Sequence, residues 1–364
     1  MTDAVTEQIA ALRDQDWAVR GEAAGLLGTF KDPRAVMPLV ALLRDRDRSV
    51  REAAIDALRS IGAPAVEAIG ICLAEPDLSV QESASAILAA IADERALTPL
   101  IKALRSSDWI VRMHAAKALG RVRHADAIEP LIPLLQDKVK AVREEAVAAL
   151  AAIGDAAIPS LLKALQHEDW LVRLHAVESL GKAKSKRAAE PLLSVLFNDR
   201  DSAVREDAVR ALGEIGDPRA VDFLFTAMQE PGLRTLAVEA LGRIGDPRAV
   251  PKLIDVLTGA GPPEVTRTVA GCGDQWNEEM ITRGAAARAL GEIGDERAIP
   301  SLVAALGPTF TRAEAATALT RFKSKIVPFL LPLLNEPRDE NVLFHIREIL
   351  ASAGWKPGRR SWTS

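Results

Sequence analysis

One short pattern, repeated along the whole chain, constrains its fold more than any other feature. An Arg followed seven residues later by a Leu recurs in eleven copies, if the two copies in which Gln or Leu replaces the Arg are included. Neighbouring copies lie 29 to 32 residues apart, with one spacing of 49. The anchor residues are Arg20, Arg51, Gln81, Arg112, Arg143, Arg173, Arg205, Arg234, Arg283, Arg312 and Leu343. Self-similarity at this period is typical of a solenoid, in which each unit packs only against its neighbours.

Each repeat predicts two helices. The first is carried by segments such as 96–104 and 298–306, whose apolar residues recur at spacings of three and four. Before several of these segments stands Gly-Asp-Pro-Arg-Ala-Val, as at 216–221 and 245–250. The Gly is expected to end one helix, the Asp to cap the next, and the Pro to occupy its first turn. The second helix follows Asp-x-x-Val-Arg.

The Asp of this motif is predicted to cap the second helix, and the Arg to link neighbouring repeats. An Arg guanidinium offers five donors, so it can reach this Asp or its counterpart in the next repeat. We interpret the pairs as a structural ladder, because a stacking residue must recur in every unit whereas a binding residue need not. The ladder residues are Asp16, Arg20, Asp47, Arg51, Asp108, Arg112, Asp169, Arg173, Asp201 and Arg205.

The pattern Asp-x-x-Val-Arg-x-x-Ala-Ala-x-Ala-Leu-Gly-x-Ile-Gly-Asp-x-Arg-Ala-Val-x-Pro-Leu resembles the HEAT repeat, and more narrowly the short HEAT-like repeat of phycobilisome (PBS) lyases, over about residues 5 to 354. The resemblance implies an all-α fold, a right-handed α-α superhelix of about eleven two-helix repeats, with the second helices on the concave face. It implies no single function. Similar proteins include scaffolds, bilin-attaching lyase subunits, a di-iron hydroxylase acting on a modified lysine, and binders of alkylated DNA. We expect one solenoid over residues 1–356 and a flexible tail at 357–364.

Composition narrows the choice of partner and compartment. The net charge of −4 argues against general binding of polyanions. Two stretches are locally basic nevertheless, the fourth repeat and the turn after the sixth: Lys102, Arg105, Arg112, Lys117, Arg121, Arg123 and His124 in the first, and Lys182, Lys184, Lys186 and Arg187 in the second. Two cysteines 200 residues apart form no disulfide framework. The N-terminus lacks the features of a signal peptide, and no uninterrupted apolar run suggests a membrane span. We therefore expect a cytoplasmic protein with no cofactor and no membrane partner.

The spacing of 49 residues marks an insertion between the two helices of the ninth repeat, at about 259–280. Its Gly and Pro residues predict a loop on one rim. Such loops often serve binding, but a surface insertion is also tolerated at little cost. Within it, Cys272 and Trp276 are candidate partner-binding residues. No His lies within the insertion to activate the thiol, so an inert cysteine is favoured.

The position two residues after each anchor carries His114, Glu145, His175 and Asp207 in four consecutive repeats. His and carboxylate side chains together suit a metal. Geometry argues against one, because helices stack about 10 Å apart, so the two histidines would be separated by about 20 Å. The similar di-iron hydroxylase carries consecutive His-Glu at such helix starts, where this chain has Met-His and Leu-His. We therefore predict no metal site and favour neighbour-to-neighbour hydrogen bonds or a polar binding strip.

Trp17, Trp109 and Trp170 each follow the capping Asp directly. If exposed, they are candidate binding hot spots. Alternatively, each indole covers the helix junction of its own repeat.

No Ser-His-Asp set, P-loop or Rossmann fingerprint supports autonomous catalysis. We predict a non-enzymatic protein–protein interaction scaffold that binds a partner through its concave face and rim loop. The alternatives are a phycobilin lyase-like protein that assists covalent tetrapyrrole attachment to a partner, and a nucleic-acid-binding protein. The C-terminal repeat, with Phe329, Leu343 and Phe344, is more apolar and predicts self-association.

Overall fold

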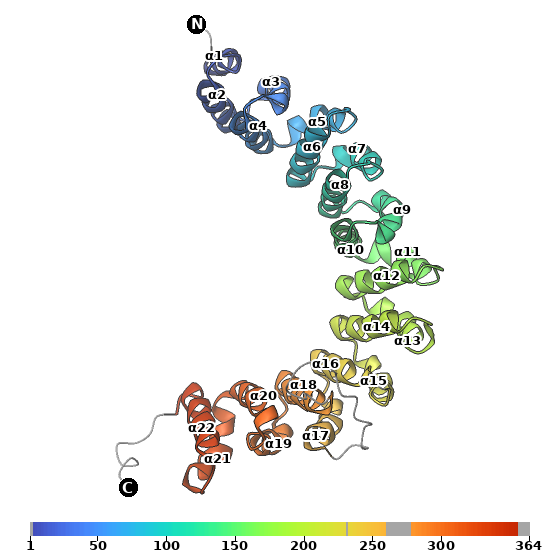
Figure 1. Ribbon diagram of the computed structural model, residues 1–364, viewed down its shortest axis with the longest axis vertical. Helices are drawn as coiled ribbons and strands as arrows, with labels where there is room; N and C mark the ends of the chain where they lie inside the picture. Colours follow the sequence, from blue (N-terminus) through green and yellow to red (C-terminus); the bar gives the residue numbers. More distant parts are fainter. Residues whose placement is uncertain (1–2, 231, 260–277, 356–364) are drawn as a thin grey trace, which may run out of the picture. The chain divides into compact units, whose positions relative to one another are not determined.

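The computed structural model describes residues 3–230, 232–259 and 278–355. Regular structure in these ranges is entirely helical (Figure 1). The helices form eleven consecutive pairs and fall into two compact units, residues 1–183 and 184–364, with six pairs in the first and five in the second. The prediction of an all-α solenoid of two-helix repeats is confirmed.

The α-helices of the first unit are α1 (Ala4–Ala11), α2 (Trp17–Phe30), α3 (Val36–Ala41), α4 (Arg48–Ile61), α5 (Val66–Cys72), α6 (Leu78–Ile91), α7 (Leu97–Ala103), α8 (Trp109–Val122), α9 (Ile128–Leu131), α10 (Lys140–Ile153), α11 (Ile158–Ala164) and α12 (Trp170–Ala183). Those of the second unit are α13 (Ala189–Asn198), α14 (Ser202–Ile215), α15 (Val221–Ala227), α16 (Arg234–Ile244), α17 (Val250–Thr258), α18 (Glu278–Ile293), α19 (Ile299–Ala304), α20 (Thr309–Thr320), α21 (Val327–Leu330) and α22 (Glu340–Ser352). Odd-numbered helices are the first helices of their repeats, and even-numbered helices are the second.

Short 3-10 turns lead into every first helix except α1. At these places the sequence predicted an α-helix whose first turn contains the Pro of the Gly-Asp-Pro motif. They are η1 (Pro33–Ala35), η3 (Ala63–Ala65), η4 (Glu94–Ala96), η5 (Ala125–Ala127), η7 (Gly154–Ala157), η8 (Lys186–Ala188), η9 (Pro218–Ala220), η10 (Pro247–Ala249), η11 (Glu296–Ala298) and η12 (Lys323–Ile326). Three more follow or extend first helices: η2 (Leu42–Arg44), η6 (Ile132–Gln136) and η13 (Pro332–Asn335). The predicted roles of the Gly-Asp-Pro motif hold at Gly216, which adopts φ +69 at the end of α14, and at Asp217, which accepts a hydrogen bond from Arg219 N–H.

The core consists of the residues that the repeat pattern selects. All eleven Leu residues seven positions after the anchors are fully buried: Leu27, Leu58, Leu88, Leu119, Leu150, Leu180, Leu212, Leu241, Leu290, Leu319 and Leu350. Burial of a Leu side chain contributes about 2 kcal/mol, so this one position accounts for much of the cohesion within each repeat.

The ladder prediction is correct for the caps and wrong for the pairing of the arginines. Asp16 Oδ1 accepts a hydrogen bond of 2.9 Å from Ala18 N–H, and the Asp of most other repeats does the same. In the first repeat, the guanidinium of Arg20 does not bind this Asp. Arg20 donates instead to the backbone carbonyl of Asp14, six residues upstream, and binds both carboxylate oxygens of Asp45 in the next repeat at 2.8 Å.

The backbone contact to the sixth residue upstream recurs in Arg51, Arg112, Arg143, Arg173 and Arg205. It satisfies carbonyls in the turn between the two helices of one repeat, which would otherwise be left unpaired near the core. The contact to the next repeat recurs between Arg112 and Asp137, with distances of 2.7 and 3.0 Å. Hydrogen bonds from Arg20 hold the pKa of Asp45 below its usual value. Burial alone would raise the pKa of Asp137, but bonds from Arg112 and a backbone N–H lower it.

Glycine sets the distance between neighbouring second helices. A Cβ on Gly28 would lie 2.8 Å from Ala57 Cα of the next second helix, and one on Gly120 would lie 2.7 Å from Ala149 Cα. The absence of the side chain therefore lets the two backbones approach closely. Arg59 takes the equivalent place in α4, and the contact between α4 and α6 is correspondingly less extensive than that between α2 and α4. Within the first unit, second helices contact one another more extensively than first helices do. This is the packing expected if they line a concave side.

One continuous helical stretch, Lys140–Ala164, is long and apolar enough to cross a membrane by length and composition. The sequence had predicted no membrane span, because it contains no uninterrupted apolar run of that length. The stretch comprises α10 and α11, which are joined through Gly154 at φ +77 and pack against neighbouring helices. Its apolar character is therefore explained by the small side chains that close helix packing requires.

Candidate functional site

Three exposed tryptophans lie along one edge of the second helices in the first unit. Trp17, Trp109 and Trp170 are the first residues of α2, α8 and α12, and each follows its capping Asp. They are 52%, 42% and 45% exposed, and Leu78 at the start of α6 is 45% exposed. The indoles therefore do not merely cover their own helix junctions. We call these four residues the apolar rim row.

Charged residues complete the row. Arg48 and Lys140 begin α4 and α10, the two second helices that lack an apolar residue at this position. Each pairs with a Glu one turn further along its own helix, Arg48 at 2.8 Å and Lys140 at 3.4 Å. The cations of the rim are thus partly neutralised, and the apolar side chains dominate this edge.

The histidine row, for which the sequence predicts neighbour-to-neighbour hydrogen bonds or a polar binding strip, lies between helices. His114 is half-buried, and its Nδ1 is 3.3 Å from Ser85 Oγ of the preceding second helix. His175 is only 8% exposed. Burial lowers the pKa of both imidazoles. Neither histidine offers much surface to a partner.

The acidic members of that row have different surroundings. Glu145 forms an ion pair with Lys117 at 3.6 Å, beside His114. Asp207 belongs to the second unit, where its Oδ1 is 3.4 Å from Arg210 Nη1 on the same helix. Cys272 and Trp276 lie outside the described residues. The other cysteine, Cys72, is buried, which raises its pKa to about 11 and leaves an unreactive thiol.

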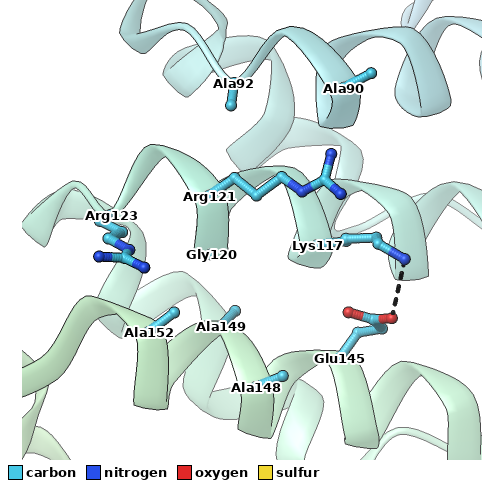
Figure 2. Close-up of a pocket in the computed structure, with 10 residues that line it drawn as sticks. All are labelled: Ala90, Ala92, Lys117, Gly120, Arg121, Arg123, Glu145, Ala148, Ala149 and Ala152. Carbon is cyan, nitrogen blue, oxygen red and sulfur yellow. Dashed lines mark ion pairs between the residues drawn. The ribbon is translucent and has the colours of Figure 1, made fainter.

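Figure 2 shows a hollow on the second-helix face, lined by residues of α8 and α10 and by residues at the C-terminal end of α6. Its volume is about 650 Å³. Lys117, Arg121 and Arg123 bring three cations to it, and Glu145 brings one carboxylate. Its remaining lining is Ala90, Ala92, Gly120, Ala148, Ala149 and Ala152. We call this site the basic hollow.

Repeat register explains why the basic hollow is open. The neighbouring repeats carry small residues at the positions equivalent to Lys117, Arg121 and Arg123 of repeat four. In repeat three these residues are Ala86, Ala90 and Ala92, and in repeat five they are Ala148, Ala152 and Gly154. One row of long cationic side chains therefore stands between two rows of small residues. The Gly120–Ala149 approach forms the floor.

The cations of the basic hollow differ in their partners. Lys117 is held by Glu145. Arg121 donates a hydrogen bond to the backbone carbonyl of Ala89 on α6. Figure 2 shows that the side chain of Arg123, at the end of α8, extends toward α10. Within the described ranges, neither arginine pairs with a carboxylate. The site can therefore accept negative charge.

The sequence shows the three basic residues but not the hollow, because the hollow depends on the small residues of the neighbouring repeats. Only when the repeats are aligned position by position do the flanking alanines appear. The acceptors Asp45 and Asp137 were missed for a similar reason. An Asp-x-Asp pattern at 45–47 places the acceptor Asp45 two residues before the cap, whereas Asp137 stands two residues before Val139 and has no such pattern.

The described residues do not fit a metal. Among them, no group of three His, Cys, Asp or Glu side chains could share an ion. The chain's single His-Glu sequence, His167-Glu168, lies in the turn before α12, where His167 Nδ1 accepts the Asp169 N–H at 3.0 Å. That ring nitrogen is already occupied in a helix-capping turn.

Family comparison agrees with this architecture. The model of HEAT repeats matches residues 6–74, 66–151, 128–196 and 189–271. This chain is a HEAT-repeat protein. The PBS lyase HEAT-like repeat model also matches residues 282–307, which cover most of α18, all of α19 and the 3-10 turn between them.

Among curated proteins, deoxyhypusine hydroxylase-B of Oryza sativa subsp. japonica is a distant homologue of this HEAT-repeat chain. The two are 30% identical over 232 residues, which cover 61% of this chain and 75% of that protein.

Solved structures support the fold. Yeast importin-beta (Kap95p) shares 15% identity at a TM-score of 0.60, and the match covers 96% of this chain and 57% of that chain. Kap121p, bound to the extreme C-terminus of the protein phosphatase Cdc14p, shares 12% identity at a TM-score of 0.62, with coverage of 96% and 45%. The chain thus spans about half of each karyopherin. These likenesses establish a HEAT solenoid and no more. The CpcE–CpcF complex of phycocyanin lyase from Nostoc sp. PCC7120 shares 24% identity at a TM-score of 0.35, with coverage of 67% and 94%.

Proposed function

We propose that this protein is a non-enzymatic scaffold that binds a partner protein through the second-helix face of its first unit. The observation that supports the proposal is the apolar rim row, in which three tryptophans are about half exposed at equivalent positions. Exposed aromatic residues at matched positions are typical of protein interfaces, and Trp is enriched among binding hot spots.

The dimensions of the face suit a protein partner. Trp109 and Arg121 lie near opposite ends of α8, and a rise of 1.5 Å per residue separates them by about 18 Å. Trp17 and Trp170 are five repeats apart, which at about 10 Å per repeat gives about 50 Å. The resulting area of about 900 Å² is close to the roughly 800 Å² that each partner contributes to a standard interface.

A capture experiment with matched variants tests this proposal. The triple variant Trp17→Ala, Trp109→Ala, Trp170→Ala is expected to lose partner proteins that the wild type retains from a cell extract. The control, Met37→Ala with Ile71→Ala, removes two apolar side chains that are more exposed than the tryptophans from the first helices of the same unit, and it should retain the partner proteins. Equal recovery by both variants, or loss in the control alone, contradicts the proposal.

Three further parts of the proposal have separate tests. Deletion of residues 260–279 should weaken capture if the insertion contributes to binding. The exposed Phe329 and Phe344 of the last repeat support self-association, which light scattering at increasing concentration would detect. A cytoplasmic location is tested by fractionation of cells that express the tagged protein.

A lyase-like role in tetrapyrrole attachment is the alternative, and the family match at residues 282–307 supports it. Visible absorbance after addition of a bilin to the purified protein tests this role. An unchanged bilin spectrum counts against it.

A further inference from the structure

We infer that the basic hollow is a docking site for an acidic segment of a partner protein, and that glutamate or aspartate side chains of this segment bind between Arg121 and Arg123. The inference rests on the proposed function, since it names the chemistry of the partner that the second-helix face would bind. It concerns residues separate from the apolar rim row and can fail independently of it.

The first observation is the imbalance of charge. Three cations and one carboxylate line the hollow, and among the described residues Arg121 and Arg123 have no carboxylate partner. A comparable cation in the second unit has carboxylate partners. Arg288, at the position equivalent to Lys117, lies 3.3 Å from Glu239 and 3.7 Å from Glu314 of the neighbouring repeats. Carboxylates from both sides neutralise Arg288. At the basic hollow, Glu145 keeps the place of Glu314, but Ala86 replaces the carboxylate of Glu239 on the other side.

The second observation is that the basic hollow is large enough to hold a bound side chain. A volume of about 650 Å³ falls within the range of about 300–1,000 Å³ in which proteins bind small ligands. The lining alanines and the buried floor at Gly120 are apolar, so a bound carboxylate would be partly shielded from water. Charge-assisted hydrogen bonds to Arg are stronger in such surroundings, and a guanidinium can bind a carboxylate through two parallel bonds.

The width of the site favours a peptide over a nucleic acid. The cations come from one repeat, so the basic strip is about 10 Å wide. Small residues border it on both sides, and Glu145 lies within it. A nucleic-acid backbone, which carries a charge at each nucleotide, is normally followed by a longer series of cations. A short acidic segment matches a single row.

Glu145 acts as an internal competitor. It holds Lys117 at 3.6 Å, and an incoming carboxylate must compete for the same ammonium group. Removing the charge of Glu145 frees Lys117 and removes repulsion, so the inference predicts stronger binding for this variant. A merely adventitious patch of surface arginines would not depend on Glu145 in this way.

Fluorescence anisotropy with a labelled octapeptide of alternating glutamate and alanine tests the inference on the full-length protein. The same peptide with glutamine in place of glutamate measures the requirement for charge, and a short single-stranded oligonucleotide tests the nucleic-acid alternative. The variants are Arg121→Ala with Arg123→Ala, Glu145→Gln, and Arg288→Ala as the matched control. Circular dichroism confirms that each variant is folded.

We expect the double arginine variant to weaken binding at least about tenfold, which corresponds to about 1.4 kcal/mol. Glu145→Gln should strengthen binding a few-fold, and Arg288→Ala should leave it unchanged. Equal losses in the double variant and the control, no gain with Glu145→Gln, or tighter binding of the oligonucleotide would each overturn the inference. If these occur while the tryptophan variant still loses its partners, the inference fails and the proposed function stands.

Discussion

The close approach of neighbouring second helices gives the sharpest stability prediction, because α2 contains one glycine at the contact and another away from it. Gly25 and Gly28 lie in the same helix, yet a Cβ on Gly25 would meet nothing within 4 Å, whereas one on Gly28 would lie 2.8 Å from Ala57 Cα and 3.0 Å from its Cβ. Both substitutions to Ala gain about 1 kcal/mol of helix propensity. Only Gly28→Ala forces α2 and α4 apart.

The magnitude follows from the two opposing effects. Overpacking costs about 1–3 kcal/mol, and the upper half of this range applies because the obstacle to the Gly28 Cβ is the backbone of α4 rather than a flexible side chain. Subtracting the propensity gain of about 1 kcal/mol leaves a net destabilisation of about 1–2 kcal/mol for Gly28→Ala. Gly25→Ala should stabilise by up to about 1 kcal/mol.

Native-state hydrogen exchange is the suitable assay, since a repeat array of this length does not unfold in a single two-state step. Backbone amides of α2 and α4 should exchange about tenfold faster in Gly28→Ala. They should exchange more slowly, or at the wild-type rate, in Gly25→Ala. If both variants shift exchange in the same direction and by the same amount, the contact with Ala57 does not limit the packing and the reasoning is refuted.

Three other predictions follow from single sites. Asp137→Ala leaves the largely buried guanidinium of Arg112 without its carboxylate partner and should lower the free energy of unfolding by about 2 kcal/mol. Glu52→Ala removes one partner of an exposed pair and should change it by less than about 0.5 kcal/mol. Chemical denaturation measures both. Burial lowers the pKa of His114, so the unfolded chain binds the proton more readily. Stability should therefore fall as pH decreases below about 6.5, and melting curves of His114→Gln should lack part of this fall. Cys72, which is 1% exposed and has its pKa raised to about 11, should react with iodoacetamide at neutral pH only after unfolding.

Much of the fold could be predicted from the sequence because the repeat pattern reports burial and capping directly. A Leu that recurs in every copy must face the core, and an Asp before a helix start has one common role, so Leu119 and Asp108 were assigned correctly. The partner of Arg20 could not be predicted in the same way. Its acceptor is set by how far the next repeat is displaced along the stack, and this displacement places Asp45, rather than the capping Asp47, beside the guanidinium.

The candidate site was predicted only in part, and the reason is again the packing between repeats. Trp109 and His114 both distinguish the fourth repeat from most other copies, but they occupy different sides of α8. Trp109 begins the helix at its exposed edge, whereas His114 contacts Ser85 of the preceding second helix and is half-buried. The basic hollow depends on alanines that look unremarkable within their own repeats. Only their position beside Arg121 in the stack gives them significance.

Hydrogen–deuterium exchange of this HEAT-repeat protein, free and in complex with a captured partner, tests the central claim most directly. The account predicts protection of α2, α6, α8 and α12 at the apolar rim row and of α6, α8 and α10 around the basic hollow, with little change in the first helices α3, α5 and α7. Protection confined to the first helices, or to the second unit, would contradict the assignment of the binding face.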